Sequence, residues 1–267
     1  MRLRIEHRTT FIYHEPISEA YTEMRLKPCD ACGQNCLSFS LVTEPRGVVM
    51  QYTDRYDNDV RHFNVLPHHT RLSVIATSDV LTPIELRDSE IALVPLDEYD
   101  YLAATRYAPH DDDILAFAQP HLVEGNHFAS AMALMRAIYY SMTYEPGATD
   151  VKTSAQNALH LKKGVCQDFA HLMLSACRSE GMPARYVSGY LYGPSSTADD
   201  AASHAWVDVF IAGKGWVSLD PTHNSPQTER YVRLGVGRDY ADVPPTLGTF
   251  RGGGKEELEV KVSVKEV

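Results

Sequence analysis

The spacing of apolar residues changes twice along the chain, and this change constrains the fold more than any other feature. Up to about Ala103, apolar and polar residues alternate in short runs, which is typical of strands with one buried face. From about Arg106 the spacing becomes that of amphipathic helices, and beyond Gly181 the alternation returns. Strands followed by helices and further strands favour an α+β protein. We therefore expect two units, residues 1–105 and 106–267.

The first unit is predicted to be an antiparallel, β-sandwich-like module. Turn-forming residues at Pro45, Asp57–Asp59 and Pro67 separate its candidate strands. A sheet with one apolar face has to bury that face against a second layer. The strands are predicted at residues 36–43, 48–53, 60–66 and 71–77.

The second unit is predicted to begin with three helices and to continue with strands. Asn126 and Ser154 are suitable N-caps for the first two helices. The third helix begins at Cys166 and ends before Gly181, because the Gly-Met-Pro sequence there stops a helix. Strands are then predicted at residues 184–192, 203–211, 216–220 and 258–264.

Charge and hydropathy exclude several classes of function. The net charge is -10, with 10 basic and 16 acidic residues in 1–105 and 15 basic and 19 acidic residues in 106–267. Nucleic-acid binding needs a basic patch that neither half supplies. No apolar run reaches the roughly 18 residues that cross a bilayer, and the N-terminus lacks the apolar stretch of a signal peptide. We therefore predict a cytoplasmic protein that binds neither nucleic acid nor membrane.

Five cysteines are too few, and odd in number, for a disulfide framework, so each thiol has to be judged by its surroundings. Cys166 stands where the chain enters an amphipathic helix. The free N–H groups and the dipole of a helix N-terminus stabilise a thiolate, which is the nucleophilic form of cysteine. Cys177 lies on the apolar stripe of the same helix and is expected to be inert.

Two residues further along the chain make Cys166 a candidate nucleophile and not only a packing residue. His204 stands at the start of one predicted strand, and Asp220 stands at the end of the next. An imidazole beside the thiol can keep it ionised and later return a proton to the leaving group. A carboxylate on the far side of the imidazole fixes its tautomer. The sequence therefore predicts a catalytic Cys166–His204–Asp220 triad.

This triad requires one register of the predicted hairpin. His204 and Asp220 point to the same side of the paired strands only if the numbers of opposed residues sum to an even value, as they do when Phe210 lies opposite Trp216. A turn that pairs Ile211 with Trp216 would place Asp220 on the wrong face. The two glycines between the strands permit the bulged turn that the required register needs.

A zinc site in the first unit is the competing interpretation of the cysteines. Cys29 and Cys32 have a spacing that is common among zinc ligands, and a third thiol with one histidine would complete a tetrahedral set. No second Cys-x-x-Cys follows, and Cys36 opens a predicted strand. We therefore predict no metal and no organic cofactor, and keep zinc as an alternative. The available histidines are His62, His68 and His69.

Four blocks of the second unit resemble the core motifs of the transglutaminase-like superfamily. The cysteine, histidine and aspartate of those motifs correspond in order to Cys166, His204 and Asp220. The chain is similar in particular to bacterial members described as cysteine proteases, and its N-terminal half and residues 237–245 also resemble parts of these proteins. The four blocks are Gly164–Ala170, Gly181–Val187, Ser203–Val207 and Gly215–Thr222.

The resemblance implies a papain-related core, in which the helix with the cysteine packs on an antiparallel sheet that carries the histidine and aspartate. It implies a thioester acyl-enzyme, which water resolves in a hydrolase and an amine resolves in a transglutaminase. Animal transglutaminases with these blocks flank their site with tryptophans, and neither Trp206 nor Trp216 has such a position, which favours hydrolysis. We expect a cysteine hydrolase with a peptide or protein substrate; a transglutaminase and a non-catalytic binding module are the alternatives.

Other residues are candidates for contact with the substrate or its oxyanion. The N–H group of Cys166 is a natural oxyanion donor at a helix start, and Gln156 or Asn157 on the preceding helix is a candidate second donor. Trp206 and Tyr240 are candidates for the cleft wall. Asp168 is expected to be structural. The aromatic residues that could replace the absent tryptophans are Tyr139, Tyr140 and Tyr144.

Overall fold

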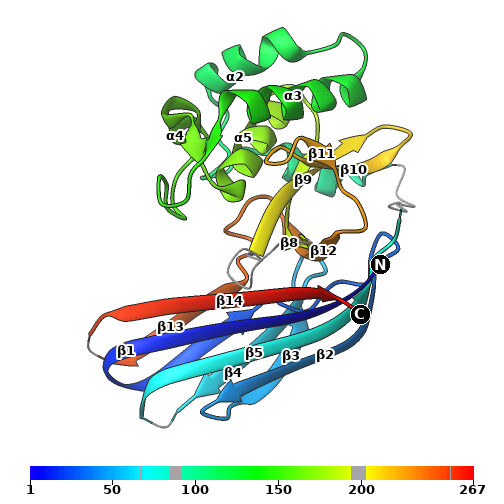
Figure 1. Ribbon diagram of the computed structural model, residues 1–267. Coiled ribbons are helices and arrows are strands. Elements are labelled where there is room, and N and C mark those ends of the chain that lie inside the picture. Colours follow the sequence, from blue (N-terminus) through cyan, green and yellow to red (C-terminus); the bar gives the residue numbers. More distant parts are fainter. Residues whose placement is uncertain (67, 85–91, 194–202, 253) are drawn as a thin grey trace.

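The computed structural model describes residues 1–66, 68–84, 92–193, 203–252 and 254–267, which form two sheet-based units (Figure 1). The lower unit in Figure 1 is an antiparallel sheet of seven strands. Its strands are β1 (Arg2–Met24), β2 (Asn35–Glu44), β3 (Val48–Thr53), β4 (Asp59–Val65), β5 (His69–Leu81), β13 (Thr246–Gly252) and β14 (Glu256–Glu266).

The long strand β1 holds this sheet together, because it has partners on both sides along most of its length. Its first half pairs with β5 and β14, and its second half pairs with β4 and β13. The register of its pairing with β5 shifts between Ile12 and Ile17, the segment that lies between the two halves of the strand. Alternate residues of β1, including Leu3 and Ile5, are buried against the core of this unit. The structure thereby confirms the predicted β-rich module.

The unit boundary predicted at residue 105 needs a correction at the end of the chain. Residues 106–267 were expected to form one unit, but β13 and β14 pair with β1 in the N-terminal sheet (Figure 1). The alternation of apolar residues shows that a strand exists, whereas its hydrogen-bonding partner is chosen by tertiary structure. The N-terminal sheet is therefore completed by the last segment of the chain.

The upper unit in Figure 1 combines an antiparallel sheet, in the order β11-β10-β9-β8-β12, with the helices. The strands of this sheet are β8 (Ala184–Leu191), β9 (Ser203–Ile211), β10 (Gly215–Asp220), β11 (Ser225–Pro226) and β12 (Tyr231–Gly237). Two short strands, β6 (Thr143–Tyr144) and β7 (Lys163–Gly164), pair in parallel beside it. The helices are α1 (Pro95–Leu102), α2 (Asp112–Ala118), the short 3₁₀ helix η1 (Gln119–His121), α3 (His127–Ser141), α4 (Ala155–Leu161) and α5 (Cys166–Ser179).

Helix α5 is the centre of this unit. It contacts α2, α3 and α4 as well as strands β8 and β9, so almost every residue along it is buried. The predicted helix caps are confirmed, since Asn126 accepts a hydrogen bond from the Ala129 N–H (3.0 Å) and Ser154 accepts one from the Asn157 N–H (3.3 Å). The expected packing of the cysteine-bearing helix on an antiparallel sheet is therefore what the chain adopts.

The two units are joined by polar contacts as well as apolar packing. His7 Nδ1 lies 2.8 Å from the Tyr190 hydroxyl of β8. The Cys29 N–H donates to the Arg233 carbonyl of β12 (3.1 Å), and the Asn58 amide donates to the Val236 carbonyl (2.8 Å). The N-terminal sheet therefore supports the sheet that carries the histidine and aspartate.

Replacing Gly189 with alanine tests how tightly β8 packs at the residue that pairs with His204. A Cβ at this position would lie 2.2 Å from the Val232 carbonyl oxygen and 2.4 Å from the Trp206 ring. We expect Gly189→Ala to lower the free energy of unfolding by about 1–3 kcal/mol in urea denaturation, because overpacking forces neighbours out of place. Gly47→Ala is the comparison, since its φ is not positive and its Cβ would come no closer than 3.1 Å to another residue, and equal losses in the two variants would contradict the expectation.

Candidate active site

Cys166 is placed at the first position of α5 by a capping interaction. The Asp168 carboxylate accepts hydrogen bonds from the Val165 N–H (2.8 Å) and from the Thr149 hydroxyl (2.6 Å). This arrangement needs glycine at position 164, where a Cβ would lie 2.5 Å from an Asp168 carboxylate oxygen. The cap fixes the helix start and leaves the Cys166 side chain half-buried.

The hairpin of β9 and β10 has the register that the triad requires. Phe210 lies opposite Trp216, and the turn contains Gly213 and Gly215 at φ angles of +76° and +82°. These positive angles are easily adopted only by glycine. The predicted pairing is confirmed, and with it His204 and Asp220 lie on the same side of the hairpin.

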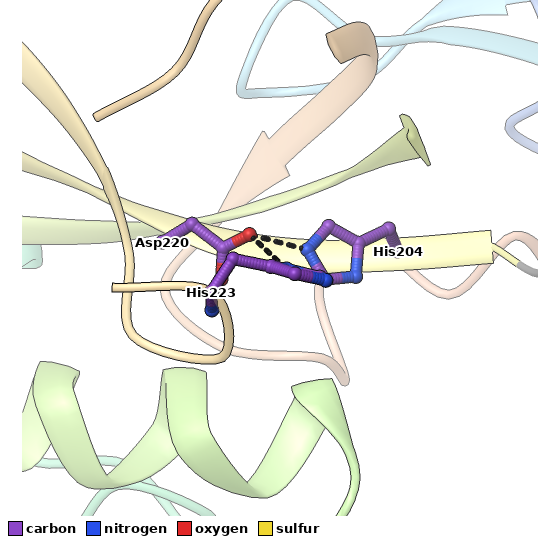
Figure 2. Close-up of side chains that lie close together, drawn as sticks. All are labelled: His204, Asp220 and His223. Atoms are coloured by element: carbon purple, nitrogen blue, oxygen red, sulfur yellow. Dashed lines mark hydrogen bonds and ion pairs between the residues drawn. The ribbon is translucent and has the colours of Figure 1, made fainter. Parts of the chain in front are cut away.

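His204 and Asp220 are joined by a short hydrogen bond (Figure 2). His204 Nε2 lies 2.7 Å from Asp220 Oδ2, and the exposed fractions of the two side chains are 8% and 0%. The other carboxylate oxygen accepts the backbone N–H groups of Thr222 (2.8 Å) and His223 (3.3 Å). The carboxylate is therefore held from both sides and orients the imidazole through Nε2.

Cys166 is the second side chain that acts on His204, and its interaction with the imidazole contributes to the raised pKa of that ring. Burial alone would lower the pKa of His204, but the hydrogen bonds to Asp220 and Cys166 outweigh it and raise the pKa to about 10. The pKa of Asp220 is well below its ordinary value, because hydrogen bonds from His204 and His223 outweigh its burial. The raised pKa keeps the His204 imidazole protonated near neutral pH, next to the ionised Asp220 carboxylate.

Sequence reasoning missed two further partners of Asp220. His223 Nδ1 lies 2.8 Å from Oδ2, and the Tyr231 hydroxyl donates to the same oxygen at 2.8 Å (Figure 2 shows the two histidines). The only signal in the sequence for His223 was its position three residues after Asp220, and Tyr231 comes from the unpredicted strand β12. Both are brought to the site by the turn after β10 and by the sheet.

Tyr144 lies close to the thiol along the chain pairing. Its strand β6 pairs with β7, so that Tyr144 lies opposite Gly164, two residues before Cys166. Burial raises the pKa of Tyr144, and the charge of Cys166 raises it further, as it does for the buried Tyr186. Tyr139 and Tyr140 contact each other edge to face on α3. Of the three candidate tyrosines, Tyr144 is thus the one whose strand pairs with the segment before Cys166.

The remaining candidates have different surroundings. Gln156 is half-buried and Asn157 exposed on α4, and a role for either one as oxyanion donor stays a prediction. Trp206 is fully buried, lies 6.1 Å from the His204 ring between ring centres, and donates its indole N–H to Gln227 (3.1 Å). This position supports the imidazole from behind and gives a substrate no surface to contact.

Tyr240 and Asp168 both have structural contacts. The Tyr240 N–H donates to His171 Nε2 (3.2 Å), and its half-buried ring packs edge to face on Tyr186. Contact of Tyr240 with a substrate therefore stays a prediction. Asp168 is 1% exposed, in agreement with the structural role expected for it. Cys177 is fully buried, and burial raises the pKa of its thiol to about 12, which makes it a poor nucleophile.

One group in the described part of the chain has the spacing of a metal site, and it does not include Cys29, Cys32 or Cys36. His204, Asp220 and His223 have ligand atoms that all lie within 4.8 Å of one another. These atoms already bond to each other, since both imidazoles donate to the carboxylate.

Removing the Asp168 carboxylate tests the cap that positions Cys166. We expect Asp168→Ala to lower the free energy of unfolding by about 1–2 kcal/mol and to slow the alkylation of Cys166, because the Val165 N–H loses its acceptor. Asp168→Asn keeps an oxygen that can accept this bond and should recover part of both losses. Thermal unfolding and iodoacetamide labelling measure the two effects, and unchanged labelling in Asp168→Ala would disprove the positioning role.

Comparison with known proteins assigns both units. Residues 91–221 match the sequence profile of the Transglutaminase-like superfamily, and residues 3–81 match that of the Bacterial transglutaminase-like N-terminal region. The uncharacterized protein ML0607 of Mycobacterium leprae is 34% identical, over 98% of this chain and 98% of its own length. A protein-glutamine gamma-glutamyltransferase of Pseudomonas aeruginosa is 32% identical over 46% of this chain and 21% of its own length.

The fold agrees with this assignment. The crystal structure of a proposed cysteine protease from Cytophaga hutchinsonii superposes with a TM-score of 0.78, covering 100% of this chain and 91% of that one at 22% sequence identity. In the residues that the structure describes, no helix combines the length and the apolarity needed to cross a bilayer. The chain belongs to the transglutaminase-like superfamily.

Proposed function

We propose that this protein is a cysteine hydrolase that cleaves amide or peptide bonds through Cys166, His204 and Asp220. The observation that carries the proposal is a half-buried thiol at a helix N-terminus that interacts with an imidazole, which is itself hydrogen-bonded to a fully buried carboxylate. The negative charge of a carboxylate with no exposed surface has to be compensated by hydrogen-bond donors, and here two of these donors are imidazoles. A purely structural polar cluster would not need the nucleophile at its end.

The proposed reaction has two steps. In the first, the Cys166 thiolate bonds to the carbonyl carbon, the C–N bond breaks, and the His204 imidazolium gives its proton to the departing amine. This leaves a thioester and a neutral imidazole. In the second, His204 takes a proton from water as the water attacks the thioester, and the carboxylic acid departs as the Cys166–His204 pair is restored. Neither step requires a metal or an organic cofactor.

The first negative charge to be stabilised is that of the tetrahedral oxyanion. The Cys166 N–H lies at the start of α5, where backbone donors are free of helical partners. Tyr144 is a candidate second donor, because it lies opposite Gly164, two residues before the thiol, and is 54% exposed. Gln156 and Asn157 stay alternatives for the same role.

Hydrolysis is favoured over amine transfer by the positions of the two tryptophans. Trp206 is 0% exposed behind His204, and Trp216 is 5% exposed and packs on Tyr101 and Phe210. Neither contributes to a walled apolar channel that would keep water from the thioester. Transglutaminase activity is the second candidate, supported by the similarity to the Pseudomonas aeruginosa gamma-glutamyltransferase.

The decisive experiment offers a glutamine-containing peptide together with a labelled primary amine. A hydrolase releases ammonia and leaves the peptide unlabelled, whereas a transglutaminase attaches the label. We expect Cys166→Ala to reduce turnover at least about a thousandfold, because it removes the nucleophile. Cys36→Ala is the control, and we expect it to retain activity. Full activity in Cys166→Ala would instead favour a non-catalytic binding module with a contaminating enzyme.

The pH dependence of kcat/KM tests the charge state of His204. Activity requires the protonated imidazole, whose pKa of about 10 places the alkaline fall of kcat/KM near that pH. The stabilising effect of this raised pKa is complete below the ordinary value of 6.5 and is lost as the pH rises through about 10. We expect Asp220→Asn to move the alkaline fall to lower pH, because the imidazolium loses its carboxylate. An alkaline fall at the same pH in both proteins would refute this assignment.

A further inference from the structure

We propose that His223 is a positioning residue that shares the Asp220 carboxylate with His204, and so limits the negative charge that Asp220 presents to the catalytic imidazole. This inference rests on the proposed hydrolase function and adds a fourth residue to the site. The observation behind it is that one carboxylate oxygen accepts hydrogen bonds from two imidazoles and a phenol.

Asp220 Oδ2 has three side-chain partners. His204 Nε2 lies at 2.7 Å, His223 Nδ1 at 2.8 Å and the Tyr231 hydroxyl at 2.8 Å. The two imidazole rings are 5.0 Å apart between centres and inclined at 66°, so they approach the carboxylate from different directions (Figure 2). The titratable groups that meet at this carboxylate are therefore His204 of β9, Tyr231 of β12 and His223, while Cys166 of α5 also acts on His204.

The contact of His223 with Asp220 is built into the turn after β10. The backbone N–H of His223 donates to Asp220 Oδ1 (3.3 Å), while its ring donates to Oδ2. The backbone N–H and the ring of His223 thus each bind one oxygen of the Asp220 carboxylate. The His223 side chain is 50% exposed, whereas His204 and Asp220 are almost completely buried. His223 consequently connects the buried pair to solvent.

An ionised carboxylate only accepts hydrogen bonds, so the His223 Nδ1 carries a proton and donates it to Asp220. Each added donor withdraws part of the carboxylate charge and weakens its hold on the other donors. A weaker pull from Asp220 favours catalysis by His204, because an imidazolium that binds its proton too tightly is a poor general acid for the departing amine. His223 and Tyr231 together keep the proton of His204 transferable.

The test compares His223→Leu, which removes the donor, with His223→Asn, whose amide can donate from the place of Nδ1. We expect His223→Leu to move the alkaline fall of kcat/KM to higher pH by about half a unit or more. Asp220 then has one donor fewer, so its charge stabilises the protonated His204 more strongly. We also expect kcat to fall several-fold for an amide and less for an activated ester, whose leaving group needs no proton, with KM little changed. His223→Asn should recover most of both effects.

His160→Asn is the matched control. His160 is another exposed histidine that contacts a carboxylate, with Nε2 2.8 Å from Asp113 Oδ2, and it lies outside the site. We expect this variant to behave like the native protein. The proposal is overturned if His223→Leu leaves kcat and the pH profile unchanged. It is equally overturned if kcat falls without a shift of the alkaline limb and His223→Asn gives no recovery, since that pattern indicates a structural role.

Imidazole NMR titration of the resting protein separates this inference from the proposed function. It follows the protonation of His204 directly and needs no turnover. A higher pKa of His204 in His223→Leu than in the native protein supports the sharing of Asp220 even if no hydrolysis is found. An unchanged His204 titration refutes the sharing even in an active hydrolase.

Discussion

The structure of the site depends on the burial of the Asp220 carboxylate. A charge that loses its contact with water has to be compensated by hydrogen-bond donors, and an incomplete set would cost several kcal/mol. Asp220 is compensated by His204, by Tyr231 and by both the ring and the backbone of His223, with the Thr222 N–H as a further donor. Because these donors come from β9, β12 and the turn after β10, one carboxylate fixes the relative positions of three parts of the sheet.

A second buried carboxylate stabilises the same sheet at a distance from the thiol. Asp208 is 0% exposed and bonds to the guanidinium groups of Arg233 (2.5 and 2.9 Å) and Arg185 (2.9 Å), which lower its pKa despite its burial. The backbone of Arg233 also contacts the N-terminal unit, where Gln34 accepts its N–H and Cys29 donates to its carbonyl. The N-terminal unit is thereby coupled to the strands that present His204 and Asp220.

The predicted triad required the register that pairs Phe210 with Trp216, and two glycines permitted its turn, although the sequence also allowed Ile211 to pair with Trp216. The caps at Asn126 and Ser154 were local signals, and the structure confirms them. The helices α1 and α2 and the strand β12 were not predicted. The 23 residues of β1 were recognised only as β-rich sequence, because its two sets of partners lie far away along the chain.

The sequence by itself determined the strand and helix types, the start of the cysteine-bearing helix and the resemblance to the superfamily. Only the tertiary structure decided that β13 and β14 complete the N-terminal sheet, that Trp206 lies behind His204, and that His223 and Tyr231 share one oxygen of Asp220. The physical reason is the range of the interactions. Periodicity, capping and turn geometry act between neighbours in the chain, whereas strand partners and the donors of a buried charge are selected by packing between distant segments.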